Sequence, residues 1–303
     1  MSEQVRMIVD VGTRLFRDQV DQRLLDGAES GSPATALWQA IVDAGFHEVG
    51  SANDTGYDEL FALLQTAGEY AVPLPLAESL LANAWAGSET GISSIGYLNG
   101  EVVTGVPWGR VARRVMGITP NSREVVVFGN PVIGEERTNM AGEPRDTVKV
   151  SAGQPLTLPM DPGLLLCLAR VVQMAGGLRT VLSMSITYAM EREQFGRTIS
   201  KFQAIQHSLA VMAAEVAAAQ RAAAAAVLAL QGEEPVIDIA AAKARVGEAV
   251  GIVAELAHQV HGAMGFTQEH RLHHFTRRLW AARDEFGRET EWQEVLGRRI
   301  ATV

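Results

Sequence analysis

The sequence has little cysteine and lacks the short motifs that mark several large enzyme classes. A single cysteine, Cys167, among 303 residues excludes an internal disulfide and a metal site built from several cysteines. The chain has no P-loop, no Gly-x-Ser-x-Gly elbow and no Cys-x-x-Cys pair. P-loop nucleotide hydrolysis, serine-hydrolase chemistry on that elbow and dithiol redox chemistry are therefore not indicated. Cys167 stands in an apolar run and is expected to be an inert core residue.

The sequence also lacks a membrane span and a secretory signal. Its long Ala-rich stretch, Ala213–Leu230, is interrupted by Glu215, Gln220 and Arg221, whereas a spanning helix needs about 18 or more consecutive apolar residues. The N-terminal residues carry charges through the part that a signal peptide keeps apolar. These observations predict a cytoplasmic protein with no membrane span.

Positive charge is scarce in the chain as a whole but not near its end. The formal net charge is -9, which argues against nucleic acid as the main partner because a phosphate backbone requires concentrated positive charge. Hydrophobic residues make up 47% and charged residues 20%, so the chain is expected to fold around a core. A basic C-terminal stretch favours an acidic partner or an anionic small ligand, with a solvated helix face as the alternative. Its arginines are Arg271, Arg277, Arg278, Arg283, Arg288, Arg298 and Arg299.

Hydrophobic periodicity and turn residues divide the chain into three predicted domains. Residues 1–86 form an N-terminal α-helical domain, residues 87–158 a short β-domain and residues 159–303 a C-terminal helical bundle domain. The predicted fold is thus mostly α with a small β insert, in which a truncated antiparallel β-domain joins two helical domains.

The expected elements follow from spacing, caps and breaks. Helices are predicted over about 5–20, over 33–44 with Ser32 as the cap and Gly45 as the stop, and over 57–70 and 76–86. Short β-branched runs predict strands at 101–104, 114–118, 124–128 and 147–150. Long helices over about 161–192, 201–230 and 236–261, followed by two shorter ones, predict an antiparallel four-helix bundle.

The segment from Tyr188 to Gln203 carries the most specific chemistry. A long helix ends at Arg192, an aromatic residue and a glycine follow at Phe195 and Gly196, and a second long helix then begins. This elbow presents a fixed cation, a flat ring and backbone N–H groups together, which suits a diphosphate next to an aromatic base. The structural alternative is that the phenylalanines of the elbow fill the bundle core and Gly196 only ends a helix.

A second segment, from Gln259 to Glu269, bends after a long helix. Its glycines Gly262 and Gly265 let the backbone approach a ligand, and Gln259 offers both a donor and an acceptor. A plain helix–helix loop is the alternative. The three histidines that follow, starting at His270, are a thin ligand set, so no metal site is predicted.

Together the two segments resemble the flavin-dependent acyl-CoA dehydrogenases, in which they stand in the same order and one long-helix pair apart. The family pattern of Tyr, Arg-x-x-Phe-Gly, Ile and Phe-Gln is met at Tyr188, Arg192, Phe195, Gly196, Ile199, Phe202 and Gln203. Its later glycine-rich pattern is met at Gln259, Gly262, Gly265, Phe266 and Glu269, with Ala263 in place of a glycine. The resemblance covers the whole chain in outline, is strongest over about 161–278, and implies the acyl-CoA dehydrogenase fold.

The resemblance implies FAD as the cofactor and an acyl-CoA as the substrate. In the family a glutamate removes the α-proton of the thioester while the β-hydride passes to flavin N5. The middle β-domain holds the isoalloxazine of its own subunit, and the elbow and bend hold the adenosine diphosphate half of a neighbouring subunit's FAD. The cofactor-binding residues implied for this chain are Arg192, Gln194, Phe195, Ile199, Phe202, Gln203, Gln259 and Gly262.

The sequence departs from the family where the flavin ring and the base would be. The middle domain is short, and the segment ending at Trp108 corresponds only to a later part of the family's flavin-contacting region. The usual base position falls on Phe286, which cannot accept a proton, and the alternative position on an earlier helix falls on Leu166. Glu285 is the one weak catalytic candidate, and with Asp284 it is otherwise expected to be a solvated acid near a helix start.

A chain that keeps the elbow but lacks the base predicts a division of labour. We expect the small subunit of a heteromeric acyl-CoA dehydrogenase of the α2β2 type, which gives FAD contacts to a larger homologous catalytic subunit. The complex would act on a bulky or steroid-derived acyl-CoA and pass electrons to an acceptor protein. Two alternatives are a self-sufficient homo-oligomeric enzyme that uses Glu285, and a non-catalytic scaffold or acyl-CoA-binding bundle.

Overall fold

The computed structural model describes residues 2–51 and 55–301, and the chain divides into two compact units. The sheet unit runs to residue 169 without residues 67–71, and the helical unit comprises residues 67–71 and the chain from Arg170 onward. Each unit has its own buried apolar residues. The three-domain division predicted from the sequence stays a prediction.

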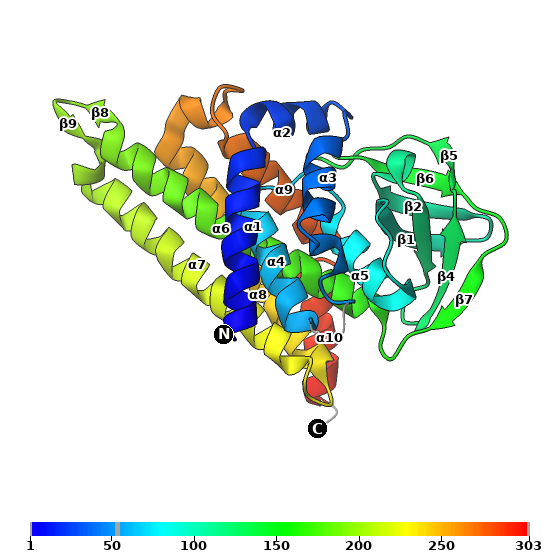
Figure 1. The fold of residues 1–303 in the computed structure, drawn as a ribbon. Coiled ribbons are helices and arrows are strands. Elements are labelled where there is room, and N and C mark those ends of the chain that lie inside the picture. The colour runs from blue at the N-terminus through cyan, green and yellow to red at the C-terminus, as the bar shows by residue number, and fades with distance from the viewer. Residues whose placement is uncertain (1, 52–54, 302–303) are drawn as a thin grey trace. The chain divides into compact units, whose positions relative to one another are not determined.

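Among the described residues, five α-helices precede the strands in chain order. They are α1 (Glu3–Gln19), α2 (Gln22–Glu29), α3 (Thr35–Asp43), α4 (Tyr57–Glu69) and α5 (Leu76–Ala86) (Figure 1). The predictions for α1, α4 and α5 are confirmed, whereas α2 was not predicted. Ser32 does not cap α3, because its backbone N–H bonds to the Gly27 carbonyl at the end of α2 and α3 begins two residues after Pro33. Gly45 does follow α3, with φ of 73°, a conformation that glycine adopts without strain.

The central sheet is larger than the sequence indicated. Seven strands stand in the order β5-β6-β2-β1-β3-β4-β7, and β1 and β3 run parallel with Ser93 opposite Arg114. The expectation of a few purely antiparallel strands is therefore wrong. The strands are β1 (Ser93–Asn99), β2 (Val102–Pro107), β3 (Arg114–Ile118), β4 (Glu124–Gly129), β5 (Val132–Glu135), β6 (Arg145–Lys149) and β7 (Gln154–Thr157).

The strands that the sequence analysis missed are β1, β5 and β7, and their composition or position in the sheet explains why. The Ser-Ser-Ile-Gly start of β1 has little β-branched character, β5 is exposed at every position, and β7 contains Pro155 on an edge of the sheet. The strands that were predicted supply the sheet core, where β-branched side chains meet Phe128. This core consists of Val103, Val106, Val115, Phe128 and Val148.

The helical unit is built on long helices that the sequence predicted closely. They are α6 (Pro162–Glu191), α7 (Gln203–Ala229) and α8 (Pro235–His261), followed by α9 (Leu272–Asp284) and α10 (Glu289–Ala301). Asp161 accepts a hydrogen bond from the Gly163 N–H at 2.8 Å and so acts at the start of α6. Along α7 the buried alanines Ala219, Ala223 and Ala226 recur at helical spacing, and α7 packs along α8 on this small-residue face.

By length and composition alone, α6 and α7 are each apolar enough to cross a membrane. In α6, 78% of the most apolar 18-residue stretch is buried within the fold, as in the core helix of a soluble protein. In α7, only 28% of the most apolar 18-residue stretch is buried. The α7 helix therefore presents a long apolar surface that other residues of the described chain leave open.

Candidate functional site

A short β-hairpin joins α6 to α7 at one end of the helical unit. Strands β8 (Glu193–Gln194) and β9 (Arg197–Thr198) pair antiparallel, and Phe195 and Gly196 form the two-residue turn (Figure 1). Both turn residues have positive φ, 55° and 76°, which is the requirement of a type I′ turn. Glycine meets that requirement freely, but a phenylalanine in the left-handed region is strained. The helix-to-helix elbow expected from the sequence is thus a hairpin with a strained aromatic residue at its tip.

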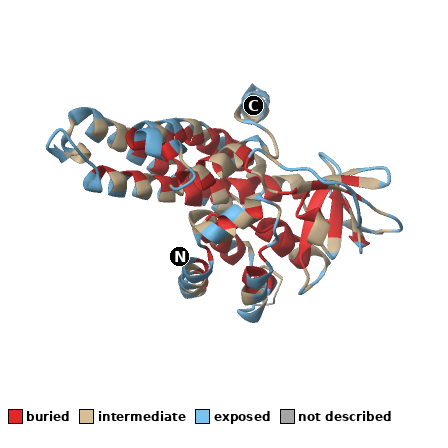
Figure 2. Cartoon of the chain, turned by 90° about the horizontal axis from the view of Figure 1, so that it is seen from above, coloured by how far each residue is buried: buried red, intermediate tan, exposed pale blue. Residues whose placement is uncertain are grey.

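Phe195 stands out in water instead of filling a core. Its relative exposure is 91%, and the hairpin end of the two long helices is among the exposed segments in Figure 2. The Phe195 ring meets Phe202 edge-on, with ring centroids 6.1 Å apart. The alternative that this phenylalanine packs in the bundle is therefore wrong, and one face of a flat apolar ring is available to a ligand.

Free positive charge accompanies the exposed ring. Arg192 ends the helical run, and its backbone carbonyl accepts a hydrogen bond from the Ile199 N–H, which extends the hairpin by one pair. The guanidinium groups of Arg192 and Arg197 make no ion pair or side-chain hydrogen bond with any residue that the structure describes. The Arg197 guanidinium lies 4.2 Å from the centroid of the Phe202 ring. The hairpin thus combines two open cations with two aromatic rings.

The remaining predicted residues of this segment surround the hairpin. Gln194 is exposed and its amide donates to the Glu193 carbonyl at 2.8 Å. Ile199 begins a short 3-10 turn (Ile199–Lys201), Phe202 is half-buried, and Gln203 is exposed at the first position of α7. All are gathered within the hairpin and the turn that follows it.

The predicted bend lies next to the hairpin in the helical unit. The rings of Tyr188, one turn before Arg192, and His261, just before Gly262, stack with centroids 4.5 Å apart. Gly262 has φ of 56° and ψ of -140°, a conformation that side-chain-bearing residues avoid, so the glycine is required for the bend. Gln259 is exposed and donates to Glu255 at 3.1 Å, which fixes its amide one turn before the bend.

A cluster of histidines underlies the bend. His261 donates from Nδ1 to the Ala257 carbonyl at 2.7 Å, and its Nε2 is buried without a hydrogen-bond partner among the described residues. Burial lowers the pKa of His261, the Ala257 carbonyl opposes this, and neighbouring His270 and His258 lower it further. Burial also lowers the pKa of His258, whose ring stacks on Phe266 at 4.6 Å. These rings support the bend as neutral imidazoles near neutral pH.

The position where the sequence expected a catalytic base is occupied by a structural cluster. Phe286 has φ of 56° and lies under the Arg170 guanidinium, 5.4 Å from its ring centroid. Arg170 donates from Nε to a Glu285 carboxylate oxygen at 2.6 Å, and its side chain is only 5% exposed. Lys243, 1% exposed, donates to the backbone carbonyl oxygens of Ala282, Arg283 and Glu285 at 2.8–2.9 Å.

This arrangement corrects the expectation for Glu285. The side chain is neither a solvated acid nor an open base, because a largely buried guanidinium holds its carboxylate. Asp284 does remain on the surface, where it pairs with Arg288 at 3.3 Å. The short ion pair stabilises the charged carboxylate and so weakens Glu285 as a proton acceptor, and the absence of a base here stays a prediction.

The helical region matches a known domain family. Residues 168–299 match the model of the acyl-CoA dehydrogenase C-terminal domain. Acyl-CoA dehydrogenase IpdE2 of Mycobacterium tuberculosis is 31% identical over 121 residues, which are 39% of this chain and 36% of that relative. The matched region therefore spans well under two thirds of that protein.

The fold of the whole chain is that of acyl-CoA dehydrogenases. The ChsE4-ChsE5 complex from Mycobacterium tuberculosis superposes with a TM-score of 0.86 at 19% identity, over 100% of this chain and 98% of the other. A steroid acyl-CoA dehydrogenase variant, Tcur3481-Tcur3483, gives a TM-score of 0.83 at 19% identity, over 99% and 98%. The mostly helical fold with a central sheet, predicted from the sequence, is confirmed.

Other positions of interest in the acyl-CoA dehydrogenase pattern lie inside the fold. Trp108 is 1% exposed with φ of 53°, so its ring is not open to a flavin. Leu166 and Cys167 are fully buried apolar positions of α6, which confirms Cys167 as a core residue. Neither the sheet unit at Trp108 nor α6 at Leu166 supplies a carboxylate.

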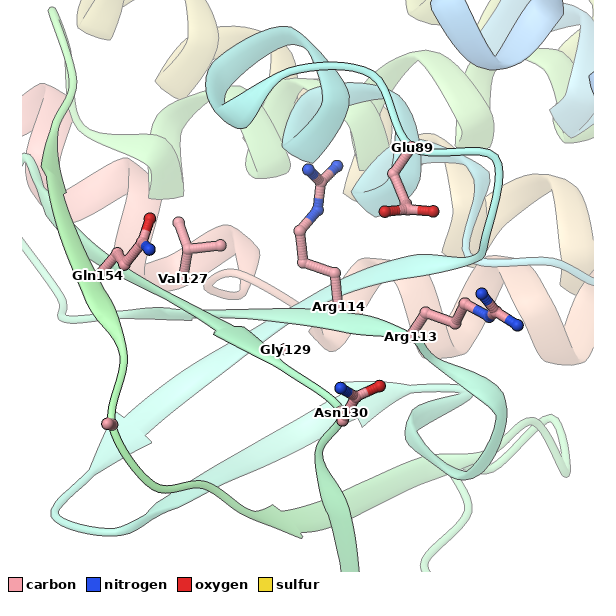
Figure 3. A pocket seen from close by; sticks show the side chains of 8 residues that line it. Glu89, Arg113, Arg114, Val127, Gly129, Asn130 and Gln154 are labelled. Atoms are coloured by element: carbon pink, nitrogen blue, oxygen red, sulfur yellow. The ribbon is translucent and has the colours of Figure 1, made fainter.

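The sheet unit also carries a polar pocket of about 370 Å³. Figure 3 shows the Glu89 carboxylate between the guanidinium groups of Arg113 and Arg114. Arg114 is committed to the fold, because it donates to Ser93 Oγ at 3.0 Å and to the Gly87 carbonyl at 2.8 Å. Burial lowers the Arg114 pKa and Glu89 opposes that effect, so these charges compensate each other. No residue predicted to bind the cofactor lines this pocket.

Three charged residues of the helical unit were missed by sequence reasoning. Arg170 and Lys243 each interrupt an apolar helix face, and a buried charge must find a partner, which is the signal that could have found them. Arg197 follows the turn glycine directly, and a basic residue there could have been read as a second cation of the elbow.

Proposed function

We propose that this chain is a subunit of an FAD-dependent acyl-CoA dehydrogenase that supplies nucleotide contacts and leaves proton abstraction to a partner. The observation that carries the proposal is the exposed hairpin, where a strained Phe195 and an unpaired Arg192 stand together. The Phe286 position, which would carry a base, supports the division because it holds an apolar ring under an ion pair.

The residues of the hairpin and bend fit the adenosine diphosphate half of FAD. Arg192 would pair with a phosphate through its planar fork of N–H donors. Phe195 would stack on the adenine, and Gln259 would use its amide on the nucleotide while Glu255 keeps it in place. Gly262 would let the backbone approach the ligand closely. Gln194, Ile199, Phe202 and Gln203 complete the predicted contacts.

The chain offers less to the flavin ring. When bound, FAD would accept the β-hydride of the acyl thioester while the α-proton leaves to a carboxylate of the partner. In this chain Trp108 is buried and the sheet unit presents no open aromatic platform at that position. We therefore assign the isoalloxazine and its chemistry to the partner's own β-domain.

The proposed partner is a larger homologous subunit that carries the base. The exposed apolar length of α7 supports an assembly, since an uncovered apolar helix of this size is a common mark of a subunit interface. The likeness to the ChsE4-ChsE5 complex and to a steroid acyl-CoA dehydrogenase supports a heteromer that acts on a bulky or steroid-derived acyl-CoA. We propose a cytoplasmic location and an electron-transfer acceptor for the complex, with no nucleic-acid partner.

Loss of Arg192 tests the nucleotide role. We would co-express the chain with a longer homologue and compare the flavin-to-protein ratio of the complex for Arg192→Ala, for the parent and for Arg6→Ala. Arg6 is an exposed arginine on α1, outside both the hairpin and α7, so it controls for the loss of one charge. Removing one charge-assisted contact is expected to weaken FAD binding about tenfold. Unchanged FAD retention in Arg192→Ala would favour the scaffold alternative.

The chain alone tests the division of labour. The proposal predicts a colourless chain that does not oxidise acyl-CoA unless the partner is added. A yellow homo-oligomer that reduces a dye with acyl-CoA would refute the proposal and favour the self-sufficient alternative.

A further inference from the structure

One face of the hairpin gathers more positive charge than Arg192 alone. In a two-stranded ladder, alternate residues share a face and directly opposed residues share it too. Arg197 is opposite Gln194, Glu193 is opposite Thr198 in the next pair outward from the turn, and Arg192 is opposite Ile199 in the pair beyond that. Arg192, Gln194, Arg197 and Ile199 therefore belong to one face, whereas the acidic Glu193 belongs to the other.

Arg197 is held in place on this face by aromatic contacts. Its guanidinium lies over the Phe202 ring at 4.2 Å, and Phe202 in turn meets Phe195 edge-on. A guanidinium held over the face of a ring can still donate from the N–H groups that do not face the ring. Those N–H groups have no hydrogen-bond partner among the described residues. Arg197 is thus a pre-positioned cation with unused donors.

We infer that Arg197 is a second phosphate-binding residue of this face, in addition to Arg192. The inference rests on the proposed nucleotide role of the same hairpin. Two guanidinium groups on one face match two linked phosphate groups, and the Phe195 ring beside them matches the base. Phe202 acts here as a positioning residue, because it holds Arg197 and touches the edge of Phe195.

A comparison of ADP with AMP separates the second cation from the first. We would measure the dissociation constants of both nucleotides for the full chain by titration calorimetry, in the parent, Arg197→Gln, Arg192→Gln and the control Arg221→Gln. Arg197→Gln is expected to weaken ADP about tenfold and AMP by less than about twofold, because only ADP has the second phosphate. Arg197→Lys keeps the charge and is expected to retain most of the preference for ADP.

Three outcomes of this experiment would overturn the inference. If Arg197→Gln weakens ADP and AMP equally, Arg197 acts only through the shape of the hairpin and the inference is wrong. If Arg197→Gln changes neither while Arg192→Gln weakens both, the inference fails but the proposed function stands. If the parent chain binds no ADP, the proposed nucleotide role fails and the inference fails with it.

Discussion

Replacing Glu285 by glutamine distinguishes a structural carboxylate from a catalytic one. Glutamine keeps the shape and one acceptor oxygen but removes the charge that meets Arg170 at 2.6 Å. Deleting one partner of a buried pair costs about 3–5 kcal/mol, but Glu285 is 21% exposed and the amide still accepts a hydrogen bond. We therefore expect a loss of about 1–2 kcal/mol, which corresponds to a fall of roughly 2–8 °C in melting temperature.

A general base would give a different result. Loss of such a group lowers the rate by roughly 10²–10⁴-fold, independently of any change in stability. The assay is therefore the thermal melt of the chain together with the initial acyl-CoA oxidation rate of the complex, measured well below the melt. Asp284→Asn is the matched control, because it makes the same chemical change one residue away at a more exposed ion pair. A Glu285→Gln variant with parental stability and a rate reduced 100-fold or more would refute the structural role.

Two further predictions concern the framework of the helical unit. Lys243→Met removes a buried ammonium group from three backbone carbonyls and should cost about 3 kcal/mol in urea unfolding, whereas Lys201→Met at an exposed position should change stability by less than about 0.5 kcal/mol. The pKa values of His258, His261 and His270 are lowered by burial, so the unfolded chain binds more protons than the fold once the pH falls below about 6.5. Stability should then be complete above about pH 6.5 and decline toward pH 5, and an unfolding midpoint that is equal at both values would contradict this.

Much of the helical architecture could be predicted because it depends on local signals. The ends of α5, α6, α7 and α8 follow from apolar periodicity and from the prolines and glycines beside them. The sheet was harder, because pairing is decided by contacts between distant segments. The parallel pairing of β1 with β3 leaves no mark in either strand alone, and a glycine-containing strand such as β1 has a weak pattern.

The candidate site likewise has residues that could be predicted from the sequence and contacts that could not. Arg192, Phe195 and Gln259 could be proposed from residue type and spacing, and the other residues of the hairpin and bend from the resemblance to the family pattern. The environment of Glu285 could not, since its partner Arg170 is 115 positions away. The prediction that no base stands at the usual position came from the identity of Phe286 alone. The physical reason that Glu285 does not substitute for it comes only from the ion pair.

The strain at Phe195 argues that the hairpin is in use. A bulky residue with positive φ costs of the order of 1–3 kcal/mol, and its exposed ring adds contact with water that a small polar residue would avoid. A type I′ turn is made more easily by Asn-Gly, so neither folding nor solubility accounts for the phenylalanine. A scaffold that no longer touched a nucleotide would gain stability by losing it. The strained ring beside two open guanidinium groups therefore favours a chain that still binds a nucleotide, and the apolar ring at Phe286 favours one that leaves the proton to its partner.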